Sequence, residues 1–386
     1  MAWPTPQEYN EAIQSPRICF SDPELRLGTP ALNSLGLPRP ISGAFASVYR
    51  VDCQQRSWAV RCFLREYADQ QQRYSAISRH LRTAGLPCMV GFQFLEKGIL
   101  VKGRWYPILK MEWVEGESLS EYLHRNRNDR PALSALSLRW LGLIRSLRKH
   151  EIAHGDLQHG NILVSDGDLK LIDYDAMFVP ALMSLESHEV GHRNYQHPNR
   201  TSRDFGPDLD NFSAWVIATS ISAQASAPEL WGQLNAGDEC LLFRREDFEK
   251  PEGSKALRAL AATEHPGIVR IAAELRRIFK LPNARIPNVG DWVLESSTSV
   301  IPARPSMKVS IVPGRPGWLN DHVDGRANHG SSRPPSEQSS PAGEMEARRW
   351  GWPVGCPKCK SAMEKFDSRQ YRCKWCGSIR MIQTGF

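Results

Sequence analysis

The sequence predicts an α+β fold with two lobes, a small strand-rich one followed by a larger helical one, and a small cysteine-rich unit near the C-terminus. Residues 37–64 and 91–114 show the alternation of apolar and polar residues that is typical of paired strands. From Gly116 to about residue 290 the apolar spacing becomes mostly helical. Strands that precede a run of helices, instead of alternating with them, favour an α+β fold. Two Cys-x-x-Cys pairs lie beyond the helices, within residues 356–376.

The composition is that of an ordinary globular protein. The chain has 386 residues, of which 41% are hydrophobic and 24% are charged, so it is long enough for two or three domains with a sizeable core. No run approaches the roughly 18 apolar residues that would span a bilayer. The N-terminal sequence MAWPTPQEYN lacks the basic and apolar regions of a secretory signal, and nine cysteines without such a signal argue against a disulfide framework. We therefore expect a cytoplasmic protein with no membrane partner, whose cysteines outside the two pairs are free thiols.

The elements of the small lobe follow one another closely along the chain. The strand-like runs SVYRVDC and WAVRCFL flank the polar turn QQRS. Residues 66–82 then carry Tyr74, Ile77 and Leu81 at the spacing of one helix face. Two longer runs, GFQFLEKGILV and RWYPILKMEWV, supply the last two strands.

The larger lobe begins with the helical runs LSEYLHRN and ALSALSLRWLGLIRSLRKH. A stretch rich in Pro, Ser, Gly and Arg, such as SSRPPSEQSSPAGE, separates this lobe from the cysteine pairs and is typical of a flexible linker. We therefore expect an N-terminal extension without periodic pattern over residues 1–26, a two-lobed body over 27–293, a flexible linker over 294–349 and a small metal-binding ribbon over 350–386.

The segment AHGDLQHGNILV, residues 153–164, carries the clearest chemical signal. Asp156 and Asn161 are separated by four residues, a predicted strand follows, and Asp173 comes at the end of the next apolar run, LKLIDYD. This arrangement suits phosphoryl transfer, in which one carboxylate orients the acceptor hydroxyl while an amide oxygen and a second carboxylate hold Mg²⁺ on the nucleotide phosphates. The spacing therefore favours a phosphoryl-transfer site in which Asp156 is the candidate for the orienting carboxylate, and Asn161 and Asp173 are the candidate magnesium ligands.

At these residues the chain resembles the protein-kinase superfamily, over about residues 37–290. Kinases have H-R-D-x-x-x-x-N in the catalytic loop and D-F-G at the metal-binding aspartate. Here the corresponding sequences are His154-Gly155-Asp156 with Asn161, and Asp173-Tyr174-Asp175. The resemblance implies a bilobal protein-kinase-like fold with a β-rich N-terminal lobe and a helical C-terminal lobe, an ATP-dependent activity and a protein substrate. It also implies that Asp156 is the catalytic base and that His154 has a packed, structural role.

Other kinase landmarks fall in the expected order. The run ISGAFASVY stands at the glycine-rich loop, WAVRCF at the V-A-I-K strand, LKMEWVEGESL at the hinge, GHRNYQHP at the end of the activation segment and DLDNFSAWV at the following helix. The resemblance implies that Asp210 in the last run braces the backbone of the catalytic loop. It also implies that nucleotide contacts come from these runs, at Gly43, Val48, Ala59, Arg61, Met111, Glu112 and Val114.

A narrower resemblance rests on HGDLQHGN, DYD, GHRNYQHP and DNFSAW together. These runs are similar to those of a bacterial family of divergent Ser/Thr-kinase-like proteins. Members of that family often carry an added C-terminal module, and some are encoded beside von Willebrand-type proteins and metal-dependent phosphatases. The resemblance therefore implies an atypical Ser/Thr kinase with partners of these kinds.

Four positions depart from the kinase pattern. Arg61 stands where kinases have a lysine, and as a larger planar fork it is not an equivalent cation. The helix that follows has no glutamate at its middle, so we expect Arg61 to lack the usual carboxylate partner. Gly155 replaces the arginine that contacts a phosphorylated activation segment, which predicts activity without that phosphorylation. Gln158 replaces a lysine near the transferred phosphoryl group, and losing one such contact typically costs on the order of 10²–10³ in rate.

The C-terminal pairs, Cys356 with Cys359 and Cys373 with Cys376, predict a structural zinc site. Four thiolates in two Cys-x-x-Cys knuckles suit tetrahedral Zn²⁺, and a domain this short needs the metal to fold. Residues 356–386 contain seven basic and two acidic residues, a net charge of +5, out of +7 for the chain. Nucleic acid, protein or solvent remain equal alternatives for this basic surface.

Two other functions remain open at the level of sequence. The HGD triplet with a downstream Asn also resembles small-molecule phosphotransferases, although the GHRNYQHP segment favours a protein substrate. Alternatively, the chain is a pseudokinase, a nucleotide-binding scaffold that displays the zinc ribbon. Arg61 and Gln158 favour the scaffold, whereas the retained base and metal ligands favour the enzyme.

Overall fold

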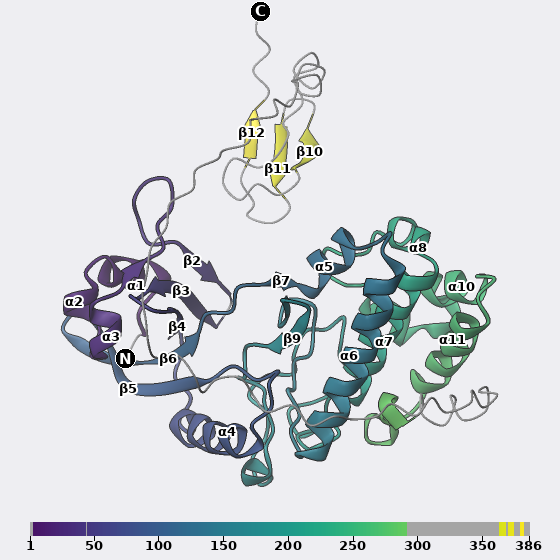
Figure 1. Cartoon of the computed structure of the whole chain (residues 1–386), viewed down its shortest axis with the longest axis horizontal. Coiled ribbons are helices and arrows are strands. Elements are labelled where there is room, and N and C mark those ends of the chain that lie inside the picture. The colour runs from purple at the N-terminus through teal and green to yellow at the C-terminus, as the bar shows by residue number, and fades with distance from the viewer. Residues whose placement is uncertain (1–2, 44, 292–362, 368–369, 374–378, 382–386) are drawn as a thin grey trace, which may run out of the picture. The chain divides into compact units, whose positions relative to one another are not determined.

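The computed structural model describes residues 3–43, 45–291, 363–367, 370–373 and 379–381. Contacts within the chain divide it into two units, Met1–Pro305 and Ser306–Phe386. The first unit is α+β, as predicted, and its strand-rich part precedes its helical part along the chain (Figure 1).

The small lobe is built on a six-stranded antiparallel sheet with the order β1-β3-β4-β6-β5, in which β2 also pairs with β3. Strands β5 and β6 are joined at Lys102 and Gly103, whose φ angles of 47° and 79° suit a tight hairpin. The bounds are β1 Thr29–Pro30, β2 Pro40–Ser42, β3 Ala46–Asp52, β4 Ser57–Phe63, β5 Phe92–Val101 and β6 Arg104–Glu112. The four longer strands lie within one or two residues of the predicted runs.

Helix α4, Gln70–Ala84, packs against this sheet. The residues expected on one face, Tyr74, Ile77 and Leu81, are all buried. The helix ends at Gly85, which adopts the left-handed conformation (φ 58°) that a helix C-terminus favours for glycine.

The N-terminal segment differs from the extension expected at residues 1–26. It forms three short helices, α1 Pro6–Ile13, α2 Pro16–Cys19 and α3 Pro23–Arg26, which each begin with a proline. Side chains from all three contribute to one buried cluster with the sheet. The helices are too short to show an apolar period, which is why the sequence pattern did not reveal them.

An ion pair network also joins this segment to the sheet. The ammonium of Lys110 on β6 is buried and lies 2.9 Å from Asp22 and 2.8 Å from Glu24. The same ammonium lies 4.3 Å from the ring centroid of Trp58. A buried ammonium needs such partners to offset its desolvation, so α3 is an integral part of the small lobe.

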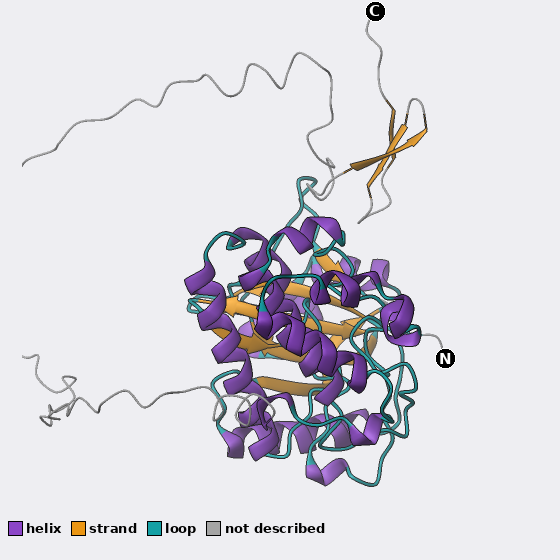
Figure 2. Ribbon diagram, turned by 90° about the vertical axis from the view of Figure 1, so that its right-hand side faces the viewer, coloured by secondary structure: helices purple, strands orange, loops and turns teal. Residues whose placement is uncertain are grey.

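Helices and loops make up most of the face of the molecule seen in Figure 2, and within the large lobe α6, α8 and α11 contact α7. Helix α7 is buried along nearly its whole length, and Trp140 of α6 donates a hydrogen bond to the backbone carbonyl of Ala214 in α7 (3.2 Å). The helices are α5 Leu119–Arg125, α6 Arg130–Lys149, α7 Asn211–Ser226, α8 Glu229–Gln233, α9 Arg245–Glu249, α10 Lys255–Ala261 and α11 Pro266–Ile278.

Three short strands form a second antiparallel sheet beside these helices, with the order β7-β8-β9. Strand β7 is Glu117–Ser118, β8 is Ile162–Ser165 and β9 is Asp168–Leu171. Since β8 begins directly after Asn161 and β9 ends two residues before Asp173, this sheet fixes both residues near one another. Three short 3₁₀ helices lie in the same lobe, η1 Pro180–Leu182, η2 Pro251–Gly253 and η3 Asn283–Arg285.

The described part of the second unit is a three-stranded antiparallel sheet, β10 Met363–Asp367, β11 Gln370–Cys373 and β12 Ile379–Met381. Among the predicted zinc ligands, Cys373 ends β11, while Cys356, Cys359 and Cys376 lie outside the described residues, as does the predicted linker, 294–349. The zinc site therefore stays a prediction. Among the described residues, no helix combines the length and apolarity that crossing a membrane requires.

Candidate active site

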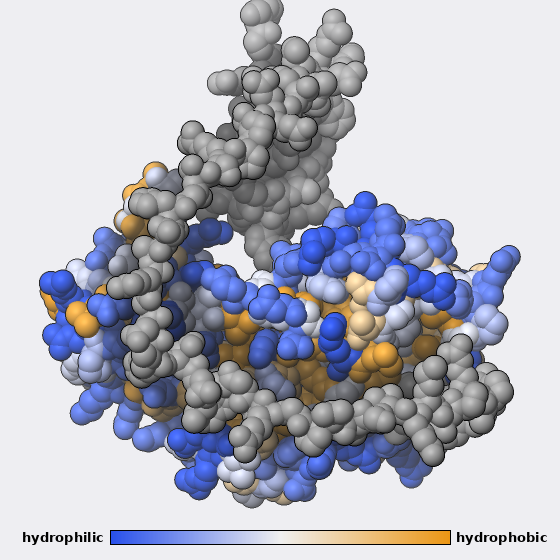
Figure 3. All heavy atoms as spheres, viewed as in Figure 1, coloured by the Kyte–Doolittle hydropathy of each residue, from blue (hydrophilic) through white to orange (hydrophobic). Residues whose placement is uncertain are grey.

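A cavity of about 430 Å³ opens between the six-stranded sheet and the large lobe. In the space-filling view, hydrophobic side chains gather in the hollow between the two lobes, whereas the outer faces are mostly hydrophilic (Figure 3). Eight of the residues predicted to bind nucleotide or metal line this cavity: Val48, Ala59, Arg61, Met111, Glu112, Val114, Asn161 and Asp173.

One end of the cavity is apolar. Antiparallel pairing sets Val48 beside Arg61 and Ala59 beside Met111, so the three strands β3, β4 and β6 present one continuous wall. The opposite wall includes Leu163 of β8 and Ile172, which follows β9. The sequence analysis did not assign these two residues to the site, because an Ile-Leu-Val run indicates a strand without indicating which side chain faces a ligand.

Two predicted nucleotide contacts, Gly43 and Glu112, differ in their position at the cavity, because Glu112 lines it and Gly43 does not. Gly43 lies at the turn between β2 and β3 and is not among the residues that line the cavity. The backbone N–H of Glu112 donates to the Gly91 carbonyl (3.2 Å), because β6 continues its pairing to this point. Among the described residues, by contrast, none accepts a hydrogen bond from the N–H of Val114. The backbone N–H of Val114, which lines the cavity, is therefore available to a ligand.

The polar end of the cavity holds Asn161 and Asp173. The amide nitrogen of Asn161 donates to the backbone carbonyl of Asp156 (2.9 Å) and to its carboxylate (3.0 Å). With the nitrogen so engaged, the amide oxygen of Asn161 is left as an acceptor, and no described residue donates to it. The backbone carbonyl of Asn161 accepts from Ile172 N–H (3.1 Å), which links it to the residue that precedes Asp173.

Asp173 adopts a conformation that L-residues seldom occupy, with φ 67°. Its side chain is 36% exposed, and Oδ1 lies 2.7 Å from Nη1 of Arg61. Such backbone geometry costs energy and is found preferentially at functional sites. A partly exposed carboxylate and a free amide oxygen are hard donors that fit a Mg²⁺ ion, which needs few protein ligands because it keeps several waters.

The Asp156 carboxylate lies beside the cavity and is held from two sides. Oδ1 accepts from the backbone N–H of His192 (2.7 Å), and Oδ2 accepts from Asn161. A Cβ on Gly191 would come within 2.8 Å of Oδ1, so glycine allows this close approach. Burial raises the pKa of Asp156, because a charged carboxylate is disfavoured away from water.

The loop that carries Asp156 is braced as predicted by Asp210. Its carboxylate accepts from the backbone N–H groups of His154 (2.5 Å) and Gly155 (2.8 Å). His154 is fully buried, and its Nε2 bonds the Ile172 carbonyl (2.9 Å), which confirms its structural role. Gln158, at the position of the missing lysine, accepts a hydrogen bond from Gly160 N–H (3.0 Å) through its side-chain oxygen.

Arg61 receives no carboxylate from helix α4, as expected, but it pairs with two carboxylates from another part of the chain. Its guanidinium pairs with both Asp173 and Asp175, although helix α4 supplies no acidic residue. Burial alone would lower the pKa of Arg61, but the two carboxylates raise it well above its ordinary value. The second of these partners, Asp175, lies two residues beyond Asp173. The hydroxyl of Tyr74 in α4 donates a hydrogen bond to the Asp175 carboxylate.

The cavity as a whole fits a nucleotide phosphate at its polar end. The Nε of Arg61 is buried without a hydrogen-bond acceptor among the described residues, and a buried cationic donor without an acceptor is costly. Arg61 also lines the cavity, so its positive charge favours an anionic ligand at this end. The apolar walls and the free N–H of Val114 suit a flat heteroaromatic base at the other end.

Comparison with known proteins finds likeness among solved structures only. No protein-family model and no curated protein matches the chain. Among solved structures, the chain is similar to the Cydia pomonella granulovirus kinase PK-1, with 15% sequence identity and a TM-score of 0.39, over 52% of this chain and 72% of that chain. The function of this chain must therefore be argued from the geometry of its own cavity.

Proposed function

We propose that the chain is an atypical ATP-dependent protein kinase of the Ser/Thr type, with the bilobal fold of that superfamily. The observation that carries the proposal is the joint placement of Asn161 and Asp173 at the polar end of an apolar cavity, with the Asp156 carboxylate hydrogen-bonded to Asn161. One half-buried carboxylate beside two hard oxygen donors suits transfer of a phosphoryl group to a hydroxyl.

In this proposal Asp156 orients the acceptor hydroxyl and accepts its proton. Each of its carboxylate oxygens receives one hydrogen bond from the protein and keeps a lone pair for a second donor. Burial raises the pKa of this carboxyl, which makes it a better proton acceptor than an exposed aspartate. The two donors also fix the carboxylate in one orientation, so a bound hydroxyl would meet a preorganised acceptor.

Arg61 and the two oxygen ligands act on the phosphates. Asn161 and Asp173 would hold Mg²⁺, which neutralises phosphate charge when it is bound. Arg61 lines the same end of the cavity, where its positive charge would attract the phosphates. Val48, Ala59 and Met111 exclude water around the base, and the Val114 N–H orients it.

A protein substrate is supported by the contact between Asp156 and the segment 191–198. The His192 N–H reaches the carboxylate itself, so the segment borders the place where an acceptor hydroxyl would lie. We propose that the C-terminal unit is a zinc ribbon that recruits substrates or partners, with phosphatase and von Willebrand-type proteins or nucleic acid as candidates. Zinc would be its third cofactor, after ATP and Mg²⁺.

The scaffold alternative is favoured by one observation, the ion pair between Arg61 and Asp173. This pair occupies a metal-ligand oxygen with a cation from the chain itself. A nucleotide-binding protein that never releases Asp173 would not transfer phosphate.

Purified protein incubated with labelled ATP and Mg²⁺ distinguishes the two functions. The kinase predicts transfer to protein hydroxyls, and loss of transfer in Asp156→Asn with nucleotide binding retained. Nucleotide binding without transfer by the wild-type protein, under conditions that include candidate protein substrates, would favour the scaffold.

A further inference from the structure

Arg61 is shared between two carboxylates, and only one of them can also serve a metal. Its Nη1 pairs with Asp173 (2.7 Å) and its Nη2 with Asp175. A divalent cation at Asp173 would repel the guanidinium, because like charges at such separations interact strongly in a partly buried site. When Asp173 binds a metal, Asp175 is therefore the carboxylate that remains to hold Arg61.

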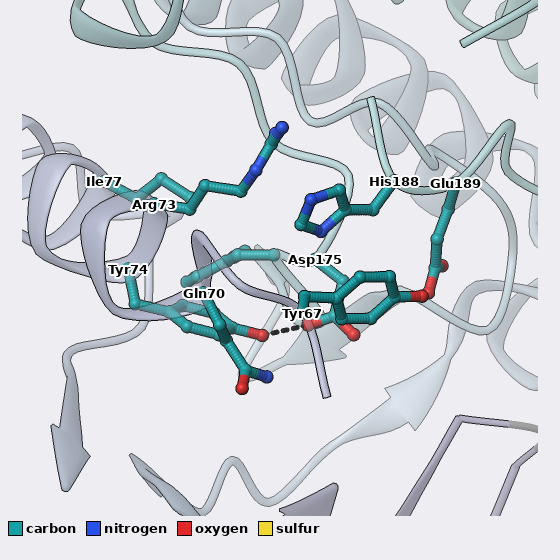
Figure 4. Close-up of a pocket in the computed structure, with 9 residues that line it drawn as sticks. Tyr67, Gln70, Arg73, Tyr74, Ile77, Asp175, His188 and Glu189 are labelled. Atoms are coloured by element: carbon teal, nitrogen blue, oxygen red, sulfur yellow. Dashed lines mark hydrogen bonds between the residues drawn. The ribbon is translucent and has the colours of Figure 1, made fainter. Parts of the chain in front are cut away.

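Asp175 is suited to this task by its surroundings. Its side chain is 14% exposed, compared with 36% for Asp173, and it does not line the cavity. One carboxylate oxygen faces Arg61, and the other accepts a hydrogen bond from the hydroxyl of Tyr74. Figure 4 shows the Tyr74 hydroxyl directed at Asp175. With both oxygens engaged inside the protein, the carboxylate has a fixed orientation and an acceptor role that a solvent-exposed aspartate would lack.

Tyr74 fixes Asp175 to helix α4. Its ring is buried among those of Phe94 (5.4 Å between centroids), Phe63 (5.8 Å) and Phe92 (5.9 Å). Packing on three sides leaves the hydroxyl few positions, and burial raises the pKa of Tyr74 well above its ordinary value, so the group stays a donor. Helix α4 thus reaches Arg61 through a hydroxyl and the D-Y-D carboxylate rather than through an acidic side chain of its own.

We propose that Asp175 and Tyr74 are positioning residues that hold Arg61 at the phosphate end of the cavity and thereby free Asp173 for the metal. The inference rests on the proposed nucleotide site. It adds that Asp175, together with Tyr74, takes the place of a carboxylate from helix α4 as the partner of Arg61. Without Asp175, Arg61 would have Asp173 as its sole carboxylate partner and would compete with Mg²⁺ for it.

Binding of a fluorescent probe, N-methylanthraniloyl-ADP, with excess Mg²⁺ and with EDTA, measures this competition. In Asp175→Asn we expect the gain in affinity due to Mg²⁺ to fall by about 10–100-fold, the range for residues that support metal ligands, while affinity in EDTA changes little. Tyr74→Phe should show a smaller loss in the same direction, because the carboxylate remains but loses one hydrogen bond. Tyr67→Phe is the matched control, since Tyr67 borders the same side of α4 but its hydroxyl makes no hydrogen bond to Asp175.

The outcomes separate this inference from the kinase proposal. A wild-type Mg²⁺ response in Asp175→Asn would overturn the inference even if the enzyme transfers phosphate. A loss in Tyr67→Phe as large as that in Tyr74→Phe would overturn the role of the Tyr74 hydroxyl. Wild-type protein that binds Mg²⁺ with the probe but transfers no phosphate would refute the kinase, whereas the Asp175→Asn result would still support or overturn the inference. Thermal melts of each variant check that it is folded.

Discussion

At the scale of single residues, the conformation of the loop that carries Asp156 depends on Gly155, which has no side chain to take part in the proposed reaction. Gly155 has φ 80°, and a Cβ there would lie 2.1 Å from the Ala176 carbonyl oxygen. The Gly155 carbonyl meanwhile accepts from Arg200 (2.6 Å) and its N–H donates to Asp210. Gly155 therefore fills a position where an arginine could not fit without moving the loop.

We predict that Gly155→Ala lowers both the melting temperature and phosphoryl transfer, because a Cβ would displace the backbone that carries Asp156. Gly142→Ala is the control, since Gly142 lies within helix α6 with open space around a Cβ. Alanine at such a helical site should stabilise by up to about 1 kcal/mol. Melting temperature and transfer rate of the two variants test the difference, and a Gly155→Ala protein equal to wild type in both would contradict it.

A second residue-scale prediction concerns pH. Burial, with the charges of Asp175 and Asp173, raises the pKa of Glu189 from 4.5 to about 7. Between these two values the folded state binds more protons than the unfolded state, so this group makes stability fall as pH rises through the window. The shift corresponds to on the order of 3 kcal/mol at most.

Glu189→Gln carries no such titration. Relative to wild type, its free energy of unfolding should therefore increase as pH rises from 4.5 to about 7 and stay level above that. Denaturant unfolding across this range measures the difference between the two proteins. A difference that does not change with pH would show that Glu189 does not titrate in this window.

At the scale of elements, the N-terminal helices complete the core of the small lobe. Tyr9 of α1 is fully buried, and its hydroxyl donates to the Phe63 carbonyl (2.7 Å) next to the end of β4. This contact links a helix near the N-terminus to the strand that carries Arg61. The small lobe therefore cannot be understood as a sheet and one helix alone.

We predict that Tyr9→Ala destabilises the protein by about 3–5 kcal/mol, the cost of removing a large buried aromatic side chain. Gln7→Ala, on the exposed face of the same helix, should change stability by less than about 0.5 kcal/mol. Denaturant unfolding of both variants tests this, and equal effects would mean that α1 does not pack on the sheet in solution.

The segment of residues 173–199 is a second element of interest, and contacts within the protein hold it in place. Its backbone is held by Arg73 at the Glu186 carbonyl and by the His192 contact to Asp156 (2.7 Å). Neither contact involves a phosphate, and Gly155 has no side chain that could pair with one.

We therefore predict that phosphatase treatment leaves the rate of phosphoryl transfer unchanged. The measurement compares treated and untreated enzyme, with mass spectrometry to establish the phosphorylation state of each. A large loss of rate after removal of phosphate from this segment would contradict the prediction.

At the scale of the whole molecule, the chain has two units that we expect to be stabilised in different ways. The first unit buries an extensive core, whereas the C-terminal sequence offers four cysteines in a short, basic stretch. Metal binding is the expected source of folding energy in so short a unit.

We predict one zinc ion in the 386-residue chain and none in a chain that ends at Arg349. Nucleotide binding should be the same in both, because the residues that line the cavity all precede residue 174. Elemental analysis together with nucleotide titration tests this. Equal zinc in both proteins, or none in the longer one, would remove the assignment of the four cysteines.

Local patterns in the sequence were enough to predict the longer strands of the small lobe, helix α4, the spacing of Asp156, Asn161 and Asp173, and the apolar runs that form the cavity wall. These features follow from local periodicity and from short spacings along the chain, which one sequence displays directly. The resemblance of DLDNFSAWV to a kinase helix implied the bracing role of Asp210, which its two backbone hydrogen bonds confirm.

Only the tertiary structure decided what surrounds Arg61. Its partners Asp173 and Asp175 lie 112 and 114 residues away, and Tyr74 lies 101 residues from Asp175. Contacts at such separations leave no periodic trace, because they depend on how the sheet, helix α4 and the D-Y-D segment pack together. The N-terminal helices could not be predicted for a related reason. Each is too short to show a helical repeat of apolar residues, and each is stabilised by packing on the sheet.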